Sequence, residues 1–91
     1  MLSLYTLICE YDGGTYIAQM SASSPKNAVL SWLGARGSWK CIPKAVRLLI
    51  KEGLDNDPPV AISGARNVWC LIASSSKGLV LINLVRTSPN R

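Results

Sequence analysis

The segments 68–73 and 79–86 constrain the fold most, because both are apolar on both of their faces. Side chains of a β-strand alternate between the two faces of a sheet. Within these segments only Asn83 and the final Arg86 are polar. The alternating sets are Val68, Cys70 and Ile72 against Trp69, Leu71 and Ala73, then Val80, Ile82 and Leu84 against Leu79, Leu81 and Val85. The serine-rich segment 74–78, which ends in glycine, predicts the turn of a β-hairpin.

A hairpin that is apolar on both faces needs a cover on each face. One layer of helices covers one face, so the other face has to meet the long connection of the chain or a second copy of it. We therefore expect a homo-oligomer, a dimer in its simplest form. The candidate interface residues are Trp69, Leu71, Leu79, Leu81 and Val85. The sequence leaves open which face of the hairpin forms the interface.

Residues 4–22 predict another β-hairpin with one apolar face. The expected core residues are Tyr5, Leu7, Cys9 and Tyr11 in the first strand and Tyr16, Ala18, Met20 and Ala22 in the second. Glycine permits the positive φ of a tight turn at Asp12-Gly13-Gly14. A Gly13-Gly14 loop pairs Tyr11 with Tyr16, whereas an Asp12-Gly13 loop shifts the pairing by two residues. Both loops keep the same residues on the same face.

The middle of the chain predicts two helices. Serine followed by proline at Ser24-Pro25 is typical of a helix start, and Gly34 and Gly37 suit its end. Its buried stripe is Ala28, Val29, Trp32 and Leu33. A second helix is expected at about 43–52, with Gly53 as its stop and an apolar side made of Ile42, Ala45, Val46, Leu49 and Ile50. The connection 53–67 contains Pro58-Pro59, which excludes a helix there, and has room for a short extended piece at 60–62.

These elements define an α+β fold with the order β-β-α-α-β-β. We expect the two antiparallel hairpins to form one four-stranded sheet beside the two helices. Ninety-one residues suit a single domain, 1–91, in which 87–91 is a frayed tail. No apolar run approaches the ~20 residues of a membrane span, and the first residues lack the basic start of a secretion signal. The chain is therefore expected in the cytoplasm and away from membranes.

The residue types argue against an enzyme. The chain contains no histidine, which is the commonest general base and metal ligand. Cys9, Cys41 and Cys70 are too far apart in the sequence for a metal knuckle or a disulfide framework. The fragment Asp55-Asn56-Asp57 lacks the other ligands of a calcium loop. We expect no catalytic residue, no cofactor and no metal.

The positive charge is segregated along the chain. The net charge is +5, and all five acids lie at Glu10, Asp12, Glu52, Asp55 and Asp57. This pattern favours an anionic partner as much as it favours simple solubility. The candidate contacts to an anion or nucleic acid are Arg36, Trp39, Lys40, Lys44, Arg47 and Lys51. Lys40 joins the basic helical face only if the helical phase extends back past Pro43.

The turn Gly34-Ala35-Arg36-Gly37 between two helices resembles the nucleotide-clamping loop of KH domains. That resemblance implies that the glycines let the backbone approach phosphates while Arg36 neutralises them. Five residues, 38–42, separate this turn from Pro43, where the second helix is expected to begin, and the strand order differs from that of KH domains. Nucleic-acid binding by this turn and the basic helix is therefore the alternative function.

Several short stretches spread over most of the chain resemble a set of small bacterial proteins of unassigned function. They are Tyr5-Thr6-Leu7, Gly13-Gly14-Thr15-Tyr16-Ile17, Ser24-Pro25 and Asn67-Val68-Trp69-Cys70. The hairpin followed by a helix is also similar to HicB-type antitoxins, but the segment that those proteins place between hairpin and helix is missing here. Neither resemblance implies an activity. The expected function is thus a non-enzymatic, homo-oligomeric binding or regulatory module that meets a protein partner.

Overall fold

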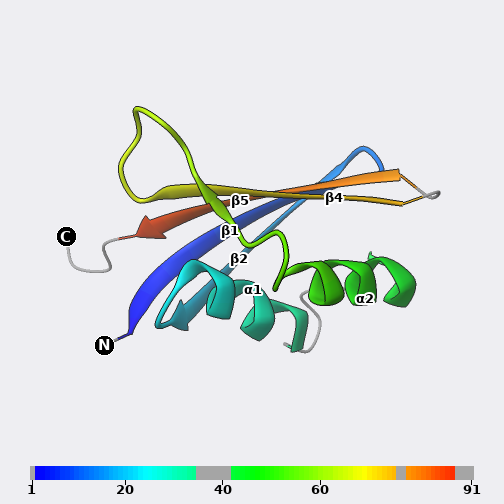
Figure 1. Ribbon diagram of the computed structural model, residues 1–91, viewed down its shortest axis with the longest axis horizontal. Helices are drawn as coiled ribbons and strands as arrows, with labels where there is room; N and C mark the ends of the chain where they lie inside the picture. Colours follow the sequence, from blue (N-terminus) through cyan, green and yellow to red (C-terminus); the bar gives the residue numbers. More distant parts are fainter. Residues whose placement is uncertain (1, 35–41, 76–77, 88–91) are drawn as a thin grey trace.

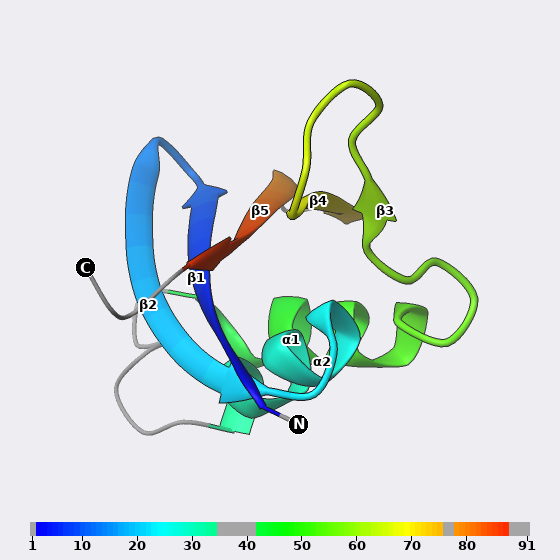
Figure 2. The same ribbon diagram turned by 90° about the vertical axis from the view of Figure 1, so that its left-hand side faces the viewer.

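The computed structural model describes residues 2–34, 42–75 and 78–87. Its elements are β1 (Ser3–Tyr11), β2 (Gly14–Ala22), α1 (Pro25–Gly34), α2 (Lys44–Gly53), β3 (Val60–Ala61), β4 (Val68–Ser75) and β5 (Gly78–Thr87). The strands form one antiparallel sheet in the order β2-β1-β5-β4-β3. Both helices lie on the same side of this sheet (Figures 1 and 2).

The predicted α+β class with two helices is confirmed, but the expected four-stranded sheet is wrong. The sheet has five strands, and the element order is β-β-α-α-β-β-β. The additional strand, β3, is the extended piece expected after the two prolines. It pairs with the outer edge of β4, where the amide of Ile62 donates to the carbonyl of Val68 at 3.0 Å.

The β1–β2 turn follows the Asp12-Gly13 alternative. Both residues have positive φ, 49° and 80°, as the two central residues of a type I′ turn require. Tyr11 therefore pairs with Gly14, and Cys9 pairs with Tyr16. The core face remains the predicted one, because the shift between the two alternatives is two residues.

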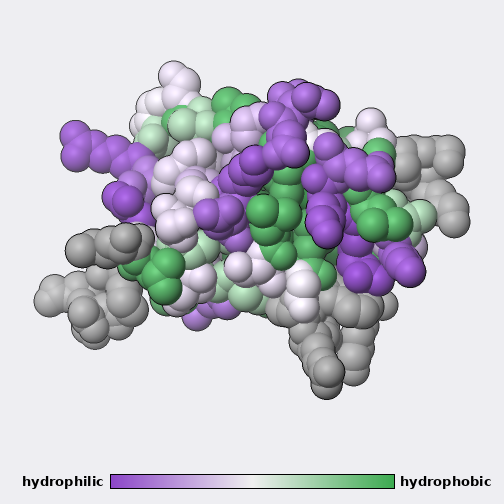
Figure 3. Space-filling view, turned by 60° about the horizontal axis from the view of Figure 1, so that its bottom comes forward, coloured by the Kyte–Doolittle hydropathy of each residue, from purple (hydrophilic) through white to green (hydrophobic). Residues whose placement is uncertain are grey.

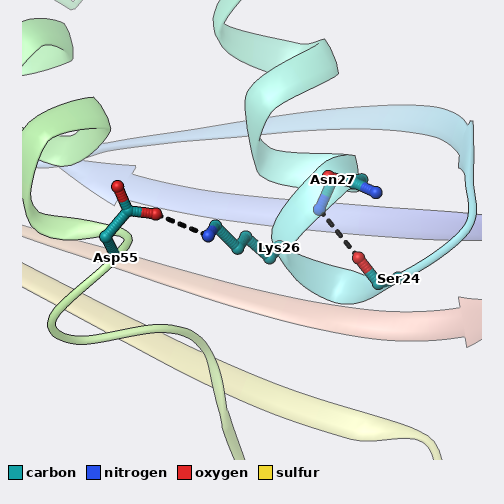
Figure 4. Close-up of polar contacts among 4 residues, drawn as sticks. All are labelled: Ser24, Lys26, Asn27 and Asp55. Carbon is teal, nitrogen blue, oxygen red and sulfur yellow. Dashed lines mark hydrogen bonds and ion pairs between the residues drawn. The ribbon is translucent and has the colours of Figure 1, made fainter.

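The start of α1 is held by side chains on both sides of the helix terminus (Figure 4). The Ser24 hydroxyl accepts a hydrogen bond from the Asn27 amide at 3.1 Å, as the sequence predicts for an N-cap. One residue into the helix, Lys26 forms an ion pair with Asp55, 2.5 Å away in the segment that follows α2. This ion pair lowers the pKa of Asp55 through its hydrogen bond and the positive charge of Lys26.

The core lies between the sheet and the helices. Its largest fully buried side chains are Trp32, Leu7, Leu54, Ile82, Leu84, Val29, Val46, Val80 and Cys9. The Tyr5 and Trp69 rings meet edge to face, with 5.8 Å between their centroids. This contact bridges β1 and β4 on the helical side of β5, since β5 lies between those strands. The helical layer thus buries one face of β1, β4 and β5.

Helix α2 begins and ends one residue later than predicted. Val46 and Ile50 are buried in it, together with Ile42 before it and Leu54 after it. Ala45, expected on the apolar side, is exposed, because the buried residues follow a spacing of four along a narrower stripe.

Thr87, expected in the frayed tail, is the last residue of β5, and residues 88–91 lie outside the described part. Within the described residues, no helix has the length and hydropathy of a membrane span.

We expect Ser24→Ala to lower the free energy of unfolding by about 1 kcal/mol, because it removes the cap acceptor of an amide at the helix start. Urea denaturation monitored by circular dichroism measures this change. Ser31→Ala is the matched control, since Ser31 is exposed in the interior of the same helix. An equal loss of stability in both variants would contradict a capping role.

Candidate interaction surfaces

The sheet face opposite the helices, here called the outer face, carries one alternating set of side chains from every strand. On β4 and β5 the set consists of Val68, Cys70, Ile72, Ser74, Leu79, Leu81, Asn83 and Val85. Neither helix covers this face (Figure 2). Ile72 is 59% exposed and Leu79 is 56% exposed. Because both faces of the second hairpin are apolar, as the sequence predicts, large apolar side chains of its outer face are exposed to solvent.

The outer face is apolar over β4 and β5 and mixed over β1 and β2, where Ile17 is 69% exposed beside threonine and glutamine side chains. We call the apolar part the apolar patch; it contains Val68, Cys70, Ile72, Leu79, Leu81 and Val85 over β4 and β5. Over β1 and its neighbours, the hydroxyls of Thr6 and Thr87 are 2.6 Å apart, and Gln19 donates to Thr6 at 3.0 Å. An interface on this face would thus combine apolar contacts over β4 and β5 with polar contacts over β1.

The five candidate interface residues do not lie together. Leu79, Leu81 and Val85 are on the outer face. Trp69 pairs with Leu84 and Leu71 pairs with Ile82, so both face the helices. Leu71 is buried there and Trp69 packs against the core. The structure therefore separates the predicted set, and only its β5 members belong to the apolar patch.

Three of the predicted basic residues come together on α2. Lys44, Arg47 and Lys51 line one groove of about 210 Å³ with Leu30, Leu33, Gly34 and Leu48. Figure 3 shows the side of the molecule that carries the helices, where hydrophobic side chains reach the surface between hydrophilic ones. In its described lining, the groove thus combines apolar side chains with three cations and no acidic residue. Arg36, Trp39 and Lys40 lie outside the described residues.

Two further grooves, which the sequence pattern does not predict, flank the β4 edge of the sheet. One, of about 250 Å³, is lined by Leu49, Ile50, Gly53, Asp57, Leu71, Ile72, Ala73 and Ser74. The other, of about 270 Å³, is lined by Asp57, Pro58, Val60, Cys70, Leu71 and Ile72. The signal that could have found them is Pro58-Pro59, because consecutive prolines limit how far a strand can pair with its neighbour.

The described cysteines differ in their surroundings. Cys9 is fully buried between the sheet and the helices, and this burial, assisted by the charge of Glu10, raises the pKa of its thiol to about 11. Cys70 is half-buried in the apolar patch. Cys41 lies outside the described residues. Among the residues that the structure describes, no three histidine, cysteine or acidic side chains gather as a metal site would need.

Comparisons with known proteins bring no relative: no family model, no curated protein and no solved structure matches this chain. The functional proposal therefore depends on the surfaces described above.

We expect Cys9 to resist thiol reagents at pH 8 until the protein unfolds, because its thiol is buried and its raised pKa leaves little thiolate at that pH. Cys70 should react first. Labelling followed by peptide mass spectrometry, in a Cys41→Ser background, measures both rates. Addition of urea should bring the rate of Cys9 up to that of Cys70. Labelling of native Cys9 as fast as Cys70 would contradict its buried position.

Proposed function

We propose that this chain is a non-enzymatic binding or regulatory module that forms a homodimer through the outer face of its sheet and meets a protein partner. The observation that carries the proposal is the apolar patch, whose members Ile72 and Leu79 are more than half exposed. Monomeric proteins rarely expose contiguous apolar patches of more than a few hundred Å². Removal of such apolar surface from water contributes roughly 25 cal/mol per Å², which offsets the entropy that association costs.

A second copy is a suitable cover because the patch can face itself across a two-fold axis. Among the strand residues of the outer face, Glu10 is the only charged one. It lies beside Leu81 at the border of the patch. Two copies therefore meet with little like-charge repulsion at the centre of the contact.

Asn83 supports a symmetric contact. It lies between Ile8 and Cys70 across the outer face and is half-buried. An amide side chain carries both donors and an acceptor, so the Asn83 residues of two copies can satisfy one another. Buried polar residues of this kind can select one register of association.

The dimer is tested by size-exclusion chromatography with light scattering at concentrations up to high micromolar. We expect twice the 9.8 kDa mass of one chain. Leu79→Lys should shift the protein to the monomer, because it places a charge inside the apolar patch. Leu48→Lys is the matched control, since Leu48 is also an exposed leucine but lies on α2, on the opposite side of the sheet. A monomeric parent protein would overturn the dimer.

Nucleic-acid binding is a second candidate function, and one observation favours it. Lys44, Arg47 and Lys51 line one groove, and the described lining of that groove contains no acidic side chain. All three cations can contact phosphates of one nucleic-acid strand if the strand lies along the groove. Each phosphate that is neutralised releases counterions. The proposal for this surface is contact with the phosphate backbone, without base readout.

We expect binding of a single-stranded RNA of about 20 nucleotides to weaken steeply with salt, with a slope of about −2 in log K against log salt for three phosphate contacts. Substitution of Lys44, Arg47 and Lys51 by alanine should remove most of this slope. Fluorescence anisotropy between about 50 and 200 mM salt measures it. Lys26→Ala is the control, because Lys26 pairs with Asp55 away from the groove. The absence of binding at low salt would end this candidate.

A further inference from the structure

Strand β4 has an edge that β3 leaves partly open. Ile62 and Val68 form a hydrogen-bonded pair, and Val60 is opposite Cys70. Hydrogen-bonded pairs recur at every second residue of an antiparallel ladder. The even-numbered residues of β4 therefore present their amides and carbonyls to β3. The next pair of this kind would join residue 58 to Ile72. Residue 58 is a proline, which has no amide hydrogen to donate to the Ile72 carbonyl. Among the described residues the ladder ends at Val60–Cys70, and the Ile72 amide makes no bond to residue 58.

The open edge therefore extends from Ile72 to Ser74. Leu71 and Ala73 are opposite Ile82 and Val80 in the β4–β5 ladder. The Arg86 amide donates to the Asn67 carbonyl at 2.9 Å, so the odd-numbered residues of β4 form the hydrogen-bonded pairs with β5. The peptide groups of Ile72 and Ser74 point the other way, away from β5. Unpaired strand edges of this kind are templates for a further strand.

The two β4 grooves lie along this same stretch of edge. Both are lined by Leu71 and Ile72, and one continues to Ser74. Leu49 and Ile50 of α2 form the apolar wall of the groove on the helical side. The edge thus combines unpaired backbone groups with hollows in which side chains of an added strand fit.

We propose that the β4 edge binds an extended segment of a protein partner as an added strand, antiparallel to β4 and in line with β3. This inference rests on the proposed protein-binding function and names the recognised segment. Backbone hydrogen bonds to Ile72 and Ser74 hold the segment, and alternate apolar side chains enter the groove beside Leu49 and Ile50. Strand addition of this kind takes its affinity from the main chain and its specificity from the alternate side chains.

Charge defines the partner further. Asp57 is the only charged residue among those that line the two grooves, and it lines both. A basic side chain at the end of the segment complements it. Strand β2 of a second copy is the obvious competing occupant, since it is also an edge strand. It contains no basic residue, so the charge of Asp57 favours a basic partner segment over a second copy.

The probe is a synthetic peptide of alternating valine and threonine with lysine at one end, capped at both termini, and its comparison peptide has glutamate in place of lysine. Threonines opposite Ile72 and Ser74 donate their amides to β4. Because opposed residues of an antiparallel pair share a face, the valines between them lie on the same face as Leu71 and Ala73 and enter the groove. N-methylation of the threonine amides should weaken binding roughly tenfold or more, through loss of two hydrogen bonds. N-methylation of the valine amides is the matched control and should leave binding unchanged.

Protein variants test the same contacts from the other side. Ile72→Pro removes the amide that points to the open edge, where proline is tolerated, together with the isoleucine side chain. Because Ile72→Ala removes the side chain alone, Ile72→Pro should weaken peptide binding roughly tenfold relative to it. Asp57→Lys should reverse the preference between the lysine and glutamate peptides. Hydrogen exchange by NMR should show fast amides at Ile72 and Ser74 in the free protein and protected amides there with peptide, while Leu71 and Ala73 stay protected throughout. This readout checks folding of every variant.

The outcomes separate the edge site from the dimer, because light scattering of the same samples reports the mass. A dimer whose Ile72 and Ser74 amides do not respond to either peptide overturns the edge site alone. A monomer that binds the lysine peptide keeps the edge site and overturns the dimer. Binding that survives N-methylation of the threonines overturns strand addition. If the Ile72 and Ser74 amides are protected without peptide and the mass exceeds that of a dimer, β2 of a second copy occupies the edge. This result would overturn the proposal that a partner segment binds there.

Discussion

The pairing of β1 with β5 is the interaction on which the rest of the structure depends. Eight residue pairs, from Leu4–Thr87 to Tyr11–Val80, join the two hairpins into one sheet. An isolated hairpin is marginally stable in water, and neither hairpin alone presents a face wide enough for both helices. Because Leu7 is opposite Leu84 in this ladder, one face of all the strands turns to α1 and α2. The same pairing leaves the apolar patch on the opposite side.

The sequence predicted the local elements because their causes are local. Positive φ at Asp12 and Gly13, the Ser24 cap and the alternation in β1 and β2 each depend on a few neighbouring residues. The face of β4 could not be predicted in this way, because residues 68–73 are apolar in both phases. That choice is made by long-range contacts, the register with β5 and the ring contact of Trp69 with Tyr5. The predicted interface therefore mixed residues from the two faces.

The grooves were harder to predict than the fold, since each is made by elements that are distant in sequence. The basic face of α2 follows from helical spacing, but its apolar neighbours Leu30 and Leu33 come from α1. The β4 grooves need α2, the residues after it and β4 together. Pro58 and Pro59 were interpreted only as helix breakers. In the sheet they also end β3 after a short pairing and leave the β4 edge open.

The apolar patch and the open edge meet at Ile72. Its side chain is exposed on the outer face, while its peptide group faces the space that β3 does not fill. A cover over the patch restrains β4, and a strand that adds to a restrained edge loses less conformational entropy on binding. Such coupling is reciprocal, because linkage requires that each binding event strengthen the other by the same factor. Dimer formation and capture of a partner segment are therefore expected to reinforce one another through one residue of β4.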